Sequence, residues 1–495
     1  AATAHATGFT DVGEDLHARD KTEVSVDGYF RTRAEYLYNL DLDRGLTPSG
    51  QALFPVPLDS PRGQALSGAD MRLRTDVSIY APGESVAVKA RLDWIDDVSM
   101  GSVPVSSAQP TGAAVNVKRA WGEVRTPIGM LAAGRMGSSW GLGILANGGD
   151  CLDCDGGDAA DRVAFVTPLL GHIFAVAYDF GSVSPTAYQK DGLRSIGLAP
   201  STGANTLTIA ALRYHTPSSL VRRNTAGLAT LDYGAYFSYR SQLRDSATTE
   251  APASGAALLG RGLTASAFDM WARFVTRWVR VEIEAVYLSA RVEDASMIPG
   301  VHYRTPVTSS QLGAALESEI AEPTGAYGLG VDTGYASGDQ APGFGAYPAS
   351  NAHPQSGDLD GLQANPPRDT TVDNFRFHPD YRIDRILFRE IIGLVTDAVY
   401  VRPHARVRLY DSAPSSVTFS AAAIASWAVY ATSTPGLQHP LGLEIDPTLT
   451  YATRDGLLFA LEYAVLFPWS GLDNPQLGLA AKPAQSWRAR MVLRF

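Results

Sequence analysis

Apolar and polar residues alternate along many stretches of this chain. In residues 69–80, Met71 and Leu73 fall on one face of an extended segment, whereas Arg72 and Arg74 fall on the other. Because successive side chains of a β-strand point to opposite sides, this period of two predicts strands with one apolar face and one charged face. Eighteen such segments occur, over the approximate spans 23–38, 69–80, 86–97, 115–126, 130–138, 160–168, 172–181, 205–216, 231–243, 264–276, 278–292, 310–321, 325–336, 396–410, 417–430, 440–453, 456–467 and 485–495.

The connections between these segments alternate in length. After even-numbered segments they are mostly tight turns such as APGES and TRDG, and after odd-numbered segments they are mostly long. A membrane barrel with short periplasmic turns and long extracellular loops requires this alternation, which a soluble β-sandwich does not. The sequence therefore predicts an all-β fold, a transmembrane antiparallel up-and-down β-barrel of about 18 strands, with 16 as the alternative count.

The barrel accounts for almost the whole chain. We divide the sequence into a periplasmic N-terminal tail, 1–22, and a single outer-membrane barrel, 23–495, within which 337–395 is a long extracellular or inward-folded loop. The chain starts with Ala1, from which we expect a signal peptide to have been removed. The final strand ends on Phe495, which resembles the C-terminal signal that the barrel-assembly machinery reads in bacterial outer-membrane proteins.

The net charge and the aromatic residues indicate which molecules surround or bind this protein. A net charge of −10 argues against nucleic acid. Aromatic residues on the apolar strand faces are typical of girdles at the two membrane interfaces, so outer-membrane lipid and lipopolysaccharide are the expected surroundings. The predicted girdle residues are Phe30, Tyr36, Tyr38, Trp94, Phe174, Tyr178, Tyr233, Phe237, Tyr239, Tyr335, Phe459 and Trp487.

The polar strand faces are rich in arginine. Basic residues outnumber acidic ones on these faces although the whole chain is acidic, and arcs of arginine in a channel favour anions. The predicted pore-lining residues are Arg31, Arg33, Arg72, Arg74, Lys89, Arg91, Arg119, Arg135, Arg273, Arg280, Arg406, Arg408, Arg488 and Arg490. The alternative is that these charges pair with acidic neighbours and only form a stable polar wall.

The loop NGGDCLDCDGGDAADR contains both cysteines of the chain. Cys151 and Cys154 lie on a predicted outer loop in an oxidising compartment, where a disulfide is expected. The surrounding acidic residues leave two interpretations open, a plain structural disulfide or a disulfide beside a Ca²⁺ site. The calcium ligands would come from Asp150, Asp153, Asp155 and Asp158. No other cofactor is predicted.

The longest connection, 337–395, ends in an amphipathic stretch, FRFHPDYRIDRILF. Loops of this length usually have a function, and in porins such a loop often folds inward. The residues predicted to narrow the pore are His378, Asp380, Tyr381, Arg382 and Arg385. The alternative is a lid over the outer mouth.

Two parts of the sequence resemble known families. LGLEIDPTLTYATRDGLLFALEYAVLFP, residues 441–468, resembles the penultimate hairpin of alginate-export-type outer-membrane barrels. The stretches GYFRTRAEYLYNLDLDRG and RAWGEVRTPIGMLAAGRMGSSWGLGILANGGDCLDCD resemble an uncharacterised outer-membrane family of myxobacteria and related deltaproteobacteria. The first resemblance implies an eighteen-stranded barrel with an arginine-rich pore for an anionic polysaccharide, and the second implies no known activity.

These observations predict an outer-membrane porin-like channel of a Gram-negative bacterium that passes anionic solutes or an acidic polysaccharide. The alternative is a plugged, non-conducting structural or adhesion barrel that presents acidic extracellular loops. None of the nine histidines belongs to a nucleophile motif such as G-x-S-x-G, so we expect no enzyme. A monomer is favoured, although the sequence does not fix the oligomeric state.

Overall fold

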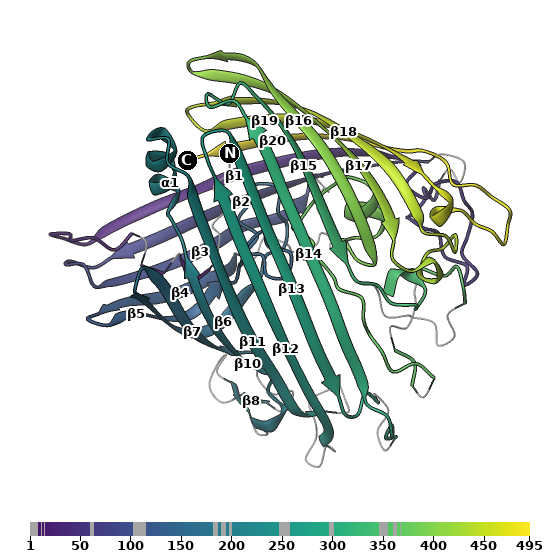
Figure 1. Ribbon diagram of the computed structural model, residues 1–495, viewed down its shortest axis with the longest axis horizontal. Coiled ribbons are helices and arrows are strands. Elements are labelled where there is room, and N and C mark those ends of the chain that lie inside the picture. Colours follow the sequence, from purple (N-terminus) through teal and green to yellow (C-terminus); the bar gives the residue numbers. More distant parts are fainter. Residues whose placement is uncertain are drawn as a thin grey trace.

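The computed structural model describes residues 8–10, 12–13, 15–59, 64–101, 115–181, 187–189, 195–197, 200–246, 258–296, 301–345, 355–359, 364–366 and 368–495. Within them, one antiparallel sheet of 18 strands curves into a barrel (Figure 1). Its strands are β1 (Glu23–Tyr38), β2 (Ala65–Tyr80), β3 (Val86–Ser99), β4 (Asn116–Thr126), β5 (Gly129–Gly137), β6 (Ala159–Leu169), β7 (His172–Phe180), β10 (Asn205–Arg213), β11 (Thr230–Ser246), β12 (Leu258–Val275), β13 (Val279–Val292), β14 (Val307–Ala321), β15 (Tyr327–Ala336), β16 (Ala398–Ser412), β17 (Ser415–Ala428), β18 (Pro440–Thr453), β19 (Leu457–Pro468) and β20 (Ala484–Arg494). The hairpin of β8 (Ala187–Gln189) and β9 (Ser195–Gly197) forms a separate small sheet between β7 and β10.

The first and last strands close the barrel. β1 pairs antiparallel with β20 from Tyr29 opposite Arg494 to Tyr38 opposite Gln485. Beyond β20, Gly28 and Phe495 exchange backbone hydrogen bonds of 3.0 and 3.1 Å. Closure leaves no unpaired sheet edge, which lipid could not hydrogen-bond. The prediction of an 18-stranded up-and-down barrel is confirmed, and so is the alternation of short and long connections.

Helical structure in the described residues is confined to short pieces. One α-helix, α1 (Pro217–Thr225), forms the one long connection at the short-turn end of the barrel, and the Thr216 hydroxyl caps its N-terminus. The single-turn helices are η1 (Pro200–Thr202), η2 (Gly343–Gly345), η3 (Leu387–Ile391), η4 (Ala431–Ser433) and η5 (Ser470–Leu472). No helix in the described part of the chain has both the length and the apolar character needed to cross a membrane.

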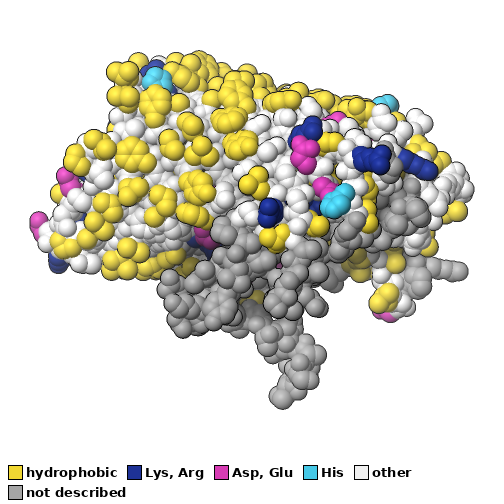
Figure 2. Space-filling model, turned by 90° about the horizontal axis from the view of Figure 1, so that it is seen from below, with side chains coloured by type: hydrophobic (Ala, Val, Ile, Leu, Met, Phe, Trp, Pro, Cys, Tyr) yellow, Lys and Arg dark blue, Asp and Glu magenta, His cyan; other side chains and the backbone are white. Residues whose placement is uncertain are grey.

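The outer surface of the barrel is apolar. Figure 2 shows hydrophobic side chains spread over the wall, with few charged ones between them. Ten of the twelve predicted girdle residues are exposed large hydrophobics, namely Tyr36, Tyr38, Trp94, Phe174, Tyr178, Tyr233, Phe237, Tyr239, Phe459 and Trp487. A surface of this kind is stable only against lipid, so the strands cross a membrane.

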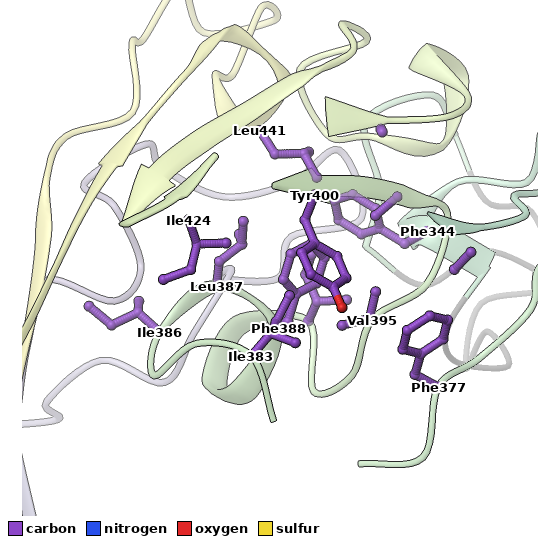
Figure 3. Packing of buried hydrophobic residues seen from close by; sticks show 14 of the residues in the cluster. Phe344, Phe377, Ile383, Ile386, Leu387, Phe388, Val395, Tyr400, Ile424 and Leu441 are labelled. Carbon is purple, nitrogen blue, oxygen red and sulfur yellow. The ribbon is translucent and has the colours of Figure 1, made fainter. Parts of the chain in front are cut away.

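Part of the barrel interior is filled by the chain itself. Residues 374–397, which we call the inner segment, pack a hydrophobic cluster against the wall (Figure 3). In this cluster Phe388 and Leu387 of the inner segment lie beside Tyr400 of β16 and Ile424 of β17. The inner segment therefore fills part of the lumen rather than covering the outer mouth.

The N-terminal segment also enters the barrel. Phe9 packs with Trp140, Tyr236 and small lumen-facing residues of the wall, and the Gly8 amide donates to the Ser139 carbonyl at 2.9 Å. The wall presents a patch of alanines here, which leaves room for a bulky side chain that would otherwise remain exposed to water. Phe9 thus lies inside the barrel, whereas Arg19 and Gly83 of the short β2–β3 turn exchange backbone hydrogen bonds of 3.0 and 2.8 Å. The periplasmic tail over 1–22 stays a prediction.

The lipid-facing surface can be tested with a single charge. Replacing exposed Ile283 on β13 with lysine should destabilise the barrel in lipid vesicles by up to about 4 kcal/mol, because the charge meets hydrocarbon. The matched control is Ser238→Lys, which places the same charge on the lumen side. Urea unfolding in vesicles gives the free energies; equal values for the two variants would contradict the assigned faces.

Candidate functional site

The fourteen predicted pore-lining residues fall into two groups. Six pair with acidic residues of the wall or its rim: Lys89 with Glu123, Arg135 with Asp161, Arg273 with Asp232, Arg280 with Glu282, Arg406 with Glu319, and Arg408 with Asp411. The other eight contact the loop of residues 138–158, which we call the cysteine loop: Arg31, Arg33, Arg72, Arg74, Arg91, Arg119, Arg488 and Arg490. Within this second group, wall carboxylates also pair with Arg31, Arg33, Arg72, Arg74, Arg91, Arg488 and Arg490, as Asp93 does with Arg74 at 2.6 Å. The interpretation of a self-paired polar wall therefore describes part of both groups.

The cysteine loop folds from the end of β5 into the lumen. Its start is held by Glu284 of β13, which accepts the Gly143 amide at 2.9 Å. Its tip is closed by the disulfide between Cys151 and Cys154. Arg72 donates to the Cys154 carbonyl at 2.7 Å, so the wall fixes the backbone of the tip as well as its side chains.

Two aspartates of the cysteine loop pair with arginines of the first strands. Asp155 lies 2.7 Å from Arg31 and 2.8 Å from Arg33. Asp150 accepts from Arg91 and lies 3.1 Å from Arg119. The loop thereby supplies negative charge to the side of the barrel where the wall is most basic.

Asp153 has the densest surroundings. Its carboxylate lies 2.6 Å from Arg389, 3.1 Å from Arg490 and 3.3 Å from Arg382. Arg33 and Arg488 follow at 3.5 and 3.6 Å. We call these five arginines the arginine cage. They come from β1, β20 and the inner segment, so one loop carboxylate joins parts of the chain that are far apart in sequence.

The arginines keep these loop carboxylates ionised. Burial alone would raise the pKa of Asp153, but Arg389, Arg490 and Arg488 hold that pKa well below its usual range. Burial likewise opposes ionisation of Asp155, and its pKa is nevertheless depressed by Arg33, Arg382 and Arg31. The ion pairs consequently persist across neutral and mildly acidic pH.

The same geometry bears on the calcium hypothesis. Asp150, Asp153 and Asp155 each point at arginines, and Asp158 lies 3.6 Å from His378. Among the described residues there is no group of three or more His, Cys, Asp or Glu side chains placed to hold a metal ion. The calcium site stays a hypothesis, and the carboxylates proposed for it have arginine or histidine partners in the described residues.

The predicted constriction residues all lie on the inner segment. The His378 amide donates to the Ile144 carbonyl of the cysteine loop at 2.8 Å, and Asp380 accepts the Asp155 amide at 3.0 Å. Arg382 contacts Asp155 at 2.8 Å. The inner segment and the cysteine loop therefore meet inside the barrel.

The remaining two constriction residues contact the wall. Tyr381 is 3.3 Å from the hydroxyl of Tyr400, and Arg385 pairs with Glu462 of β19 at 2.6 Å. Glu444 of β18 accepts the amides of residues 385, 386 and 387 at 2.8, 2.8 and 3.0 Å. A buried wall carboxylate thus fixes the turn that carries Arg382 and Arg389.

The alternating pattern did not predict that two adjacent aspartates of β3 both face the lumen. Asp96 and Asp97 are adjacent, yet both reach inward: Asp96 lies 3.2 Å from Arg72, and Asp97 contacts Arg31 and Arg72. The register of β2 and β3 shifts nearby, and Asp97 has a φ of 50°. A bulge of this kind turns two consecutive residues to one side. The sequence signal is the acidic doublet itself, since strict alternation would place one aspartate in lipid.

Cavities remain around the loops among the described residues of the barrel interior. One of about 560 Å³ lies between the cysteine loop and the basic wall, and its lining includes Arg74, Arg91, Arg119, Arg135 and Arg240. A second of about 250 Å³ lies between the inner segment and β16–β20, beside Asp153. A third of about 290 Å³ is lined by aromatic and hydroxyl side chains and shares Arg240 with the first. The cysteine loop lies between the first two cavities.

Comparison with known proteins finds similarity to solved structures. No protein-family model and no curated protein matches the sequence. Among solved structures, the chain is similar to an anion-selective porin from Comamonas acidovorans, with 10% identity, 96% of this chain and 100% of that chain covered, and a TM-score of 0.41. A BenF-like porin from Pseudomonas fluorescens Pf-5 is 6% identical, with 96% of this chain and 100% of that chain covered and a TM-score of 0.49. OpdL from Pseudomonas aeruginosa is 9% identical, with 96% of this chain and 98% of that chain covered and a TM-score of 0.47. At such identities and scores, solute and selectivity have to be argued from this chain's own residues.

The glutamate that holds the inner segment gives a first prediction for this site. Glu444→Ala removes the acceptor of three amides, each worth about 1–3 kcal/mol when left unpaired. Hydrogen exchange at residues 385–387 should therefore become faster in the folded barrel. The matched control, Glu319→Ala, removes a lumenal glutamate that pairs with Arg406, and exchange at 385–387 should not change. Equal exchange in both variants would contradict the role of Glu444.

A second prediction concerns pH at the outer end of the barrel. Asp397 is fully buried just before β16 and accepts the Tyr430 amide at 3.0 Å. Burial raises the pKa of Asp397 to about 7, against the lowering effect of Ser433 and Tyr430. Since the folded pKa is raised, this contribution to stability is present below the unfolded value of about 3.9 and is lost as pH rises through 7.

The thermal midpoint should accordingly be higher at pH 5.5 than at pH 8.5, and Asp397→Asn should reduce that difference. Thermal circular dichroism of the two proteins at both pH values makes the comparison. An identical pH dependence in wild type and variant would show that Asp397 does not titrate in this range.

Proposed function

We propose that the protein is a small-anion channel of a Gram-negative outer membrane, whose passage is controlled by the cysteine loop and the inner segment. The observation that carries this proposal is the arginine lining. Eight wall arginines bind carboxylates or carbonyl groups of the cysteine loop in addition to the carboxylates that the wall itself supplies. A surface that binds tethered carboxylates in this way has the chemistry to bind free ones.

Free positive charge in the lumen supports the same proposal. Arg240 is exposed and lines two of the interior cavities, and its guanidinium group has no ion-pair or hydrogen-bond partner among the described residues. Arg135, in the same cavity, pairs only with the half-exposed Asp161. A cavity with such residues on its wall raises the local concentration of anions.

Small anions fit this interior better than a polymer. The resemblance of residues 441–468 to alginate-export barrels implies an acidic polysaccharide, which would need one continuous groove. In the described residues the cysteine loop instead lies between two separate cavities of about 560 and 250 Å³. Solutes of a few carbon atoms can occupy such spaces in turn, so we place small carboxylates before polysaccharides.

The second candidate function is a plugged structural barrel. The observation in its favour is the hydrophobic cluster that the inner segment forms with β16, β17 and β18, since such packing resists displacement. This candidate predicts a silent bilayer, which separates it from the channel.

Ion selectivity tests the proposed channel. In a planar bilayer under a KCl gradient, the purified protein should give a stable conductance with an anion-selective reversal potential. Arg135→Ser combined with Arg240→Ser should lower the anion preference about two- to threefold, because both guanidinium groups line the cavity of about 560 Å³. The control Arg291→Ser removes an exposed arginine that pairs with Glu293, and the preference should hold. Cation selectivity in the wild type would reject the proposal.

A further inference from the structure

The arginine cage around Asp153 is incompletely satisfied. Among the described residues, the buried Oδ1 of Asp153 has no hydrogen bond, although Arg490 lies 3.1 Å away. The Nε and Nη1 atoms of Arg488, the Nε of Arg490 and the Nε of Arg382 are likewise buried without a hydrogen-bond partner. Carboxylates lie near the arginines of the cage, but several guanidinium N–H donors of the cage have no acceptor among the described residues.

The tether of Asp153 explains this mismatch. Two contacts fix the backbone of the loop tip. Asp153 lies within the ring closed by the Cys151–Cys154 disulfide, and Arg382 donates a hydrogen bond to the Asp153 carbonyl. With its backbone fixed, Asp153 accepts a hydrogen bond from Arg389 through Oδ2, whereas Oδ1 lies at ion-pair distance from Arg490 without a hydrogen bond. A free carboxylate can orient both oxygens, and arginine pairs bind best in that bidentate geometry.

The cage also has space beside it. The cavity of about 250 Å³ is lined by Asp153 together with Arg382, Arg389 and Arg490 of the cage, and Arg402 lies on the same wall. The Asp153 side chain keeps 18% of its surface exposed. An anion in this cavity would therefore reach the same guanidinium groups that Asp153 contacts.

We propose that the arginine cage is a binding site for a small free carboxylate, and that Asp153 is a tethered occupant that this carboxylate displaces. The exchange replaces one carboxylate by another, so no arginine is left buried without a counter-charge. Displacement of Asp153 would remove the ion pairs between the arginine cage and the tip of the cysteine loop, which lies between the two charged cavities. This inference rests on the proposed anion channel and adds the class of solute and its point of entry.

Acetate binding to Asp153→Ala tests the site directly. The variant removes the tethered carboxylate and leaves the cage, so calorimetric titration of the purified, detergent-solubilised variant should show acetate binding at least about tenfold tighter than in wild type. Acetamide, which has the same shape without the charge, should not bind. The matched control is Asp411→Ala, which removes an aspartate that pairs with an arginine outside the cage, and it should gain no acetate binding.

The outcomes separate this inference from the proposed function. A folded Asp153→Ala that binds no acetate, in a protein whose wild type is anion-selective, would overturn the site and leave the channel. Acetate binding by the variant, in a protein whose wild type is cation-selective, would support the site and overturn the channel. If Asp153→Ala does not fold, as judged by circular dichroism, the isosteric Asp153→Asn takes its place, and absence of tighter acetate binding there would also reject the proposal.

Discussion

Each buried arginine on the inner wall of this barrel needs a counter-charge, and the position of the available carboxylates decides how the interior is arranged. On the acidic side, the wall supplies it from neighbouring strands, as Glu319 does for Arg406. On the basic side, formed by β1 to β4 and β20, the strands carry too few carboxylates. The cysteine loop supplies the rest, because a buried guanidinium without a partner costs several kcal/mol.

Filling the lumen in this way sets two requirements against each other. The loops must be held well enough to satisfy the wall, and a channel requires that they can be moved. The structure divides the two requirements between different contacts. The carboxylates of Glu284 and Glu444 accept backbone amides of the cysteine loop and of the inner segment, respectively. Together with the hydrophobic cluster, they hold these two segments against the wall. Ion pairs, which an anion can replace without loss of charge balance, hold the tip at Asp153.

The sequence predicted the wall of the barrel far better than its contents. A strand that crosses lipid must alternate, and the alternation of Met71, Arg72, Leu73 and Arg74 is therefore visible without any tertiary contact. The acidic doublet at Asp96 and Asp97 shows the limit of that rule, since a bulge is a local exception to the period of two. Neither the inward path of Phe9 nor the Glu444 anchor has a periodic signal, because both depend on which strand lies opposite.

The cysteine loop illustrates why chemistry read from a segment in isolation is incomplete. Taken alone, four aspartates around a disulfide suggest an oxygen-rich site for a cation. Within the barrel the same carboxylates meet an excess of guanidinium groups, and the preferred counter-ion changes from a cation outside the protein to arginines within it. What such a loop binds is therefore set by the charge of the wall it folds against, and the same argument makes a free anion, rather than a metal, the natural competitor for its place.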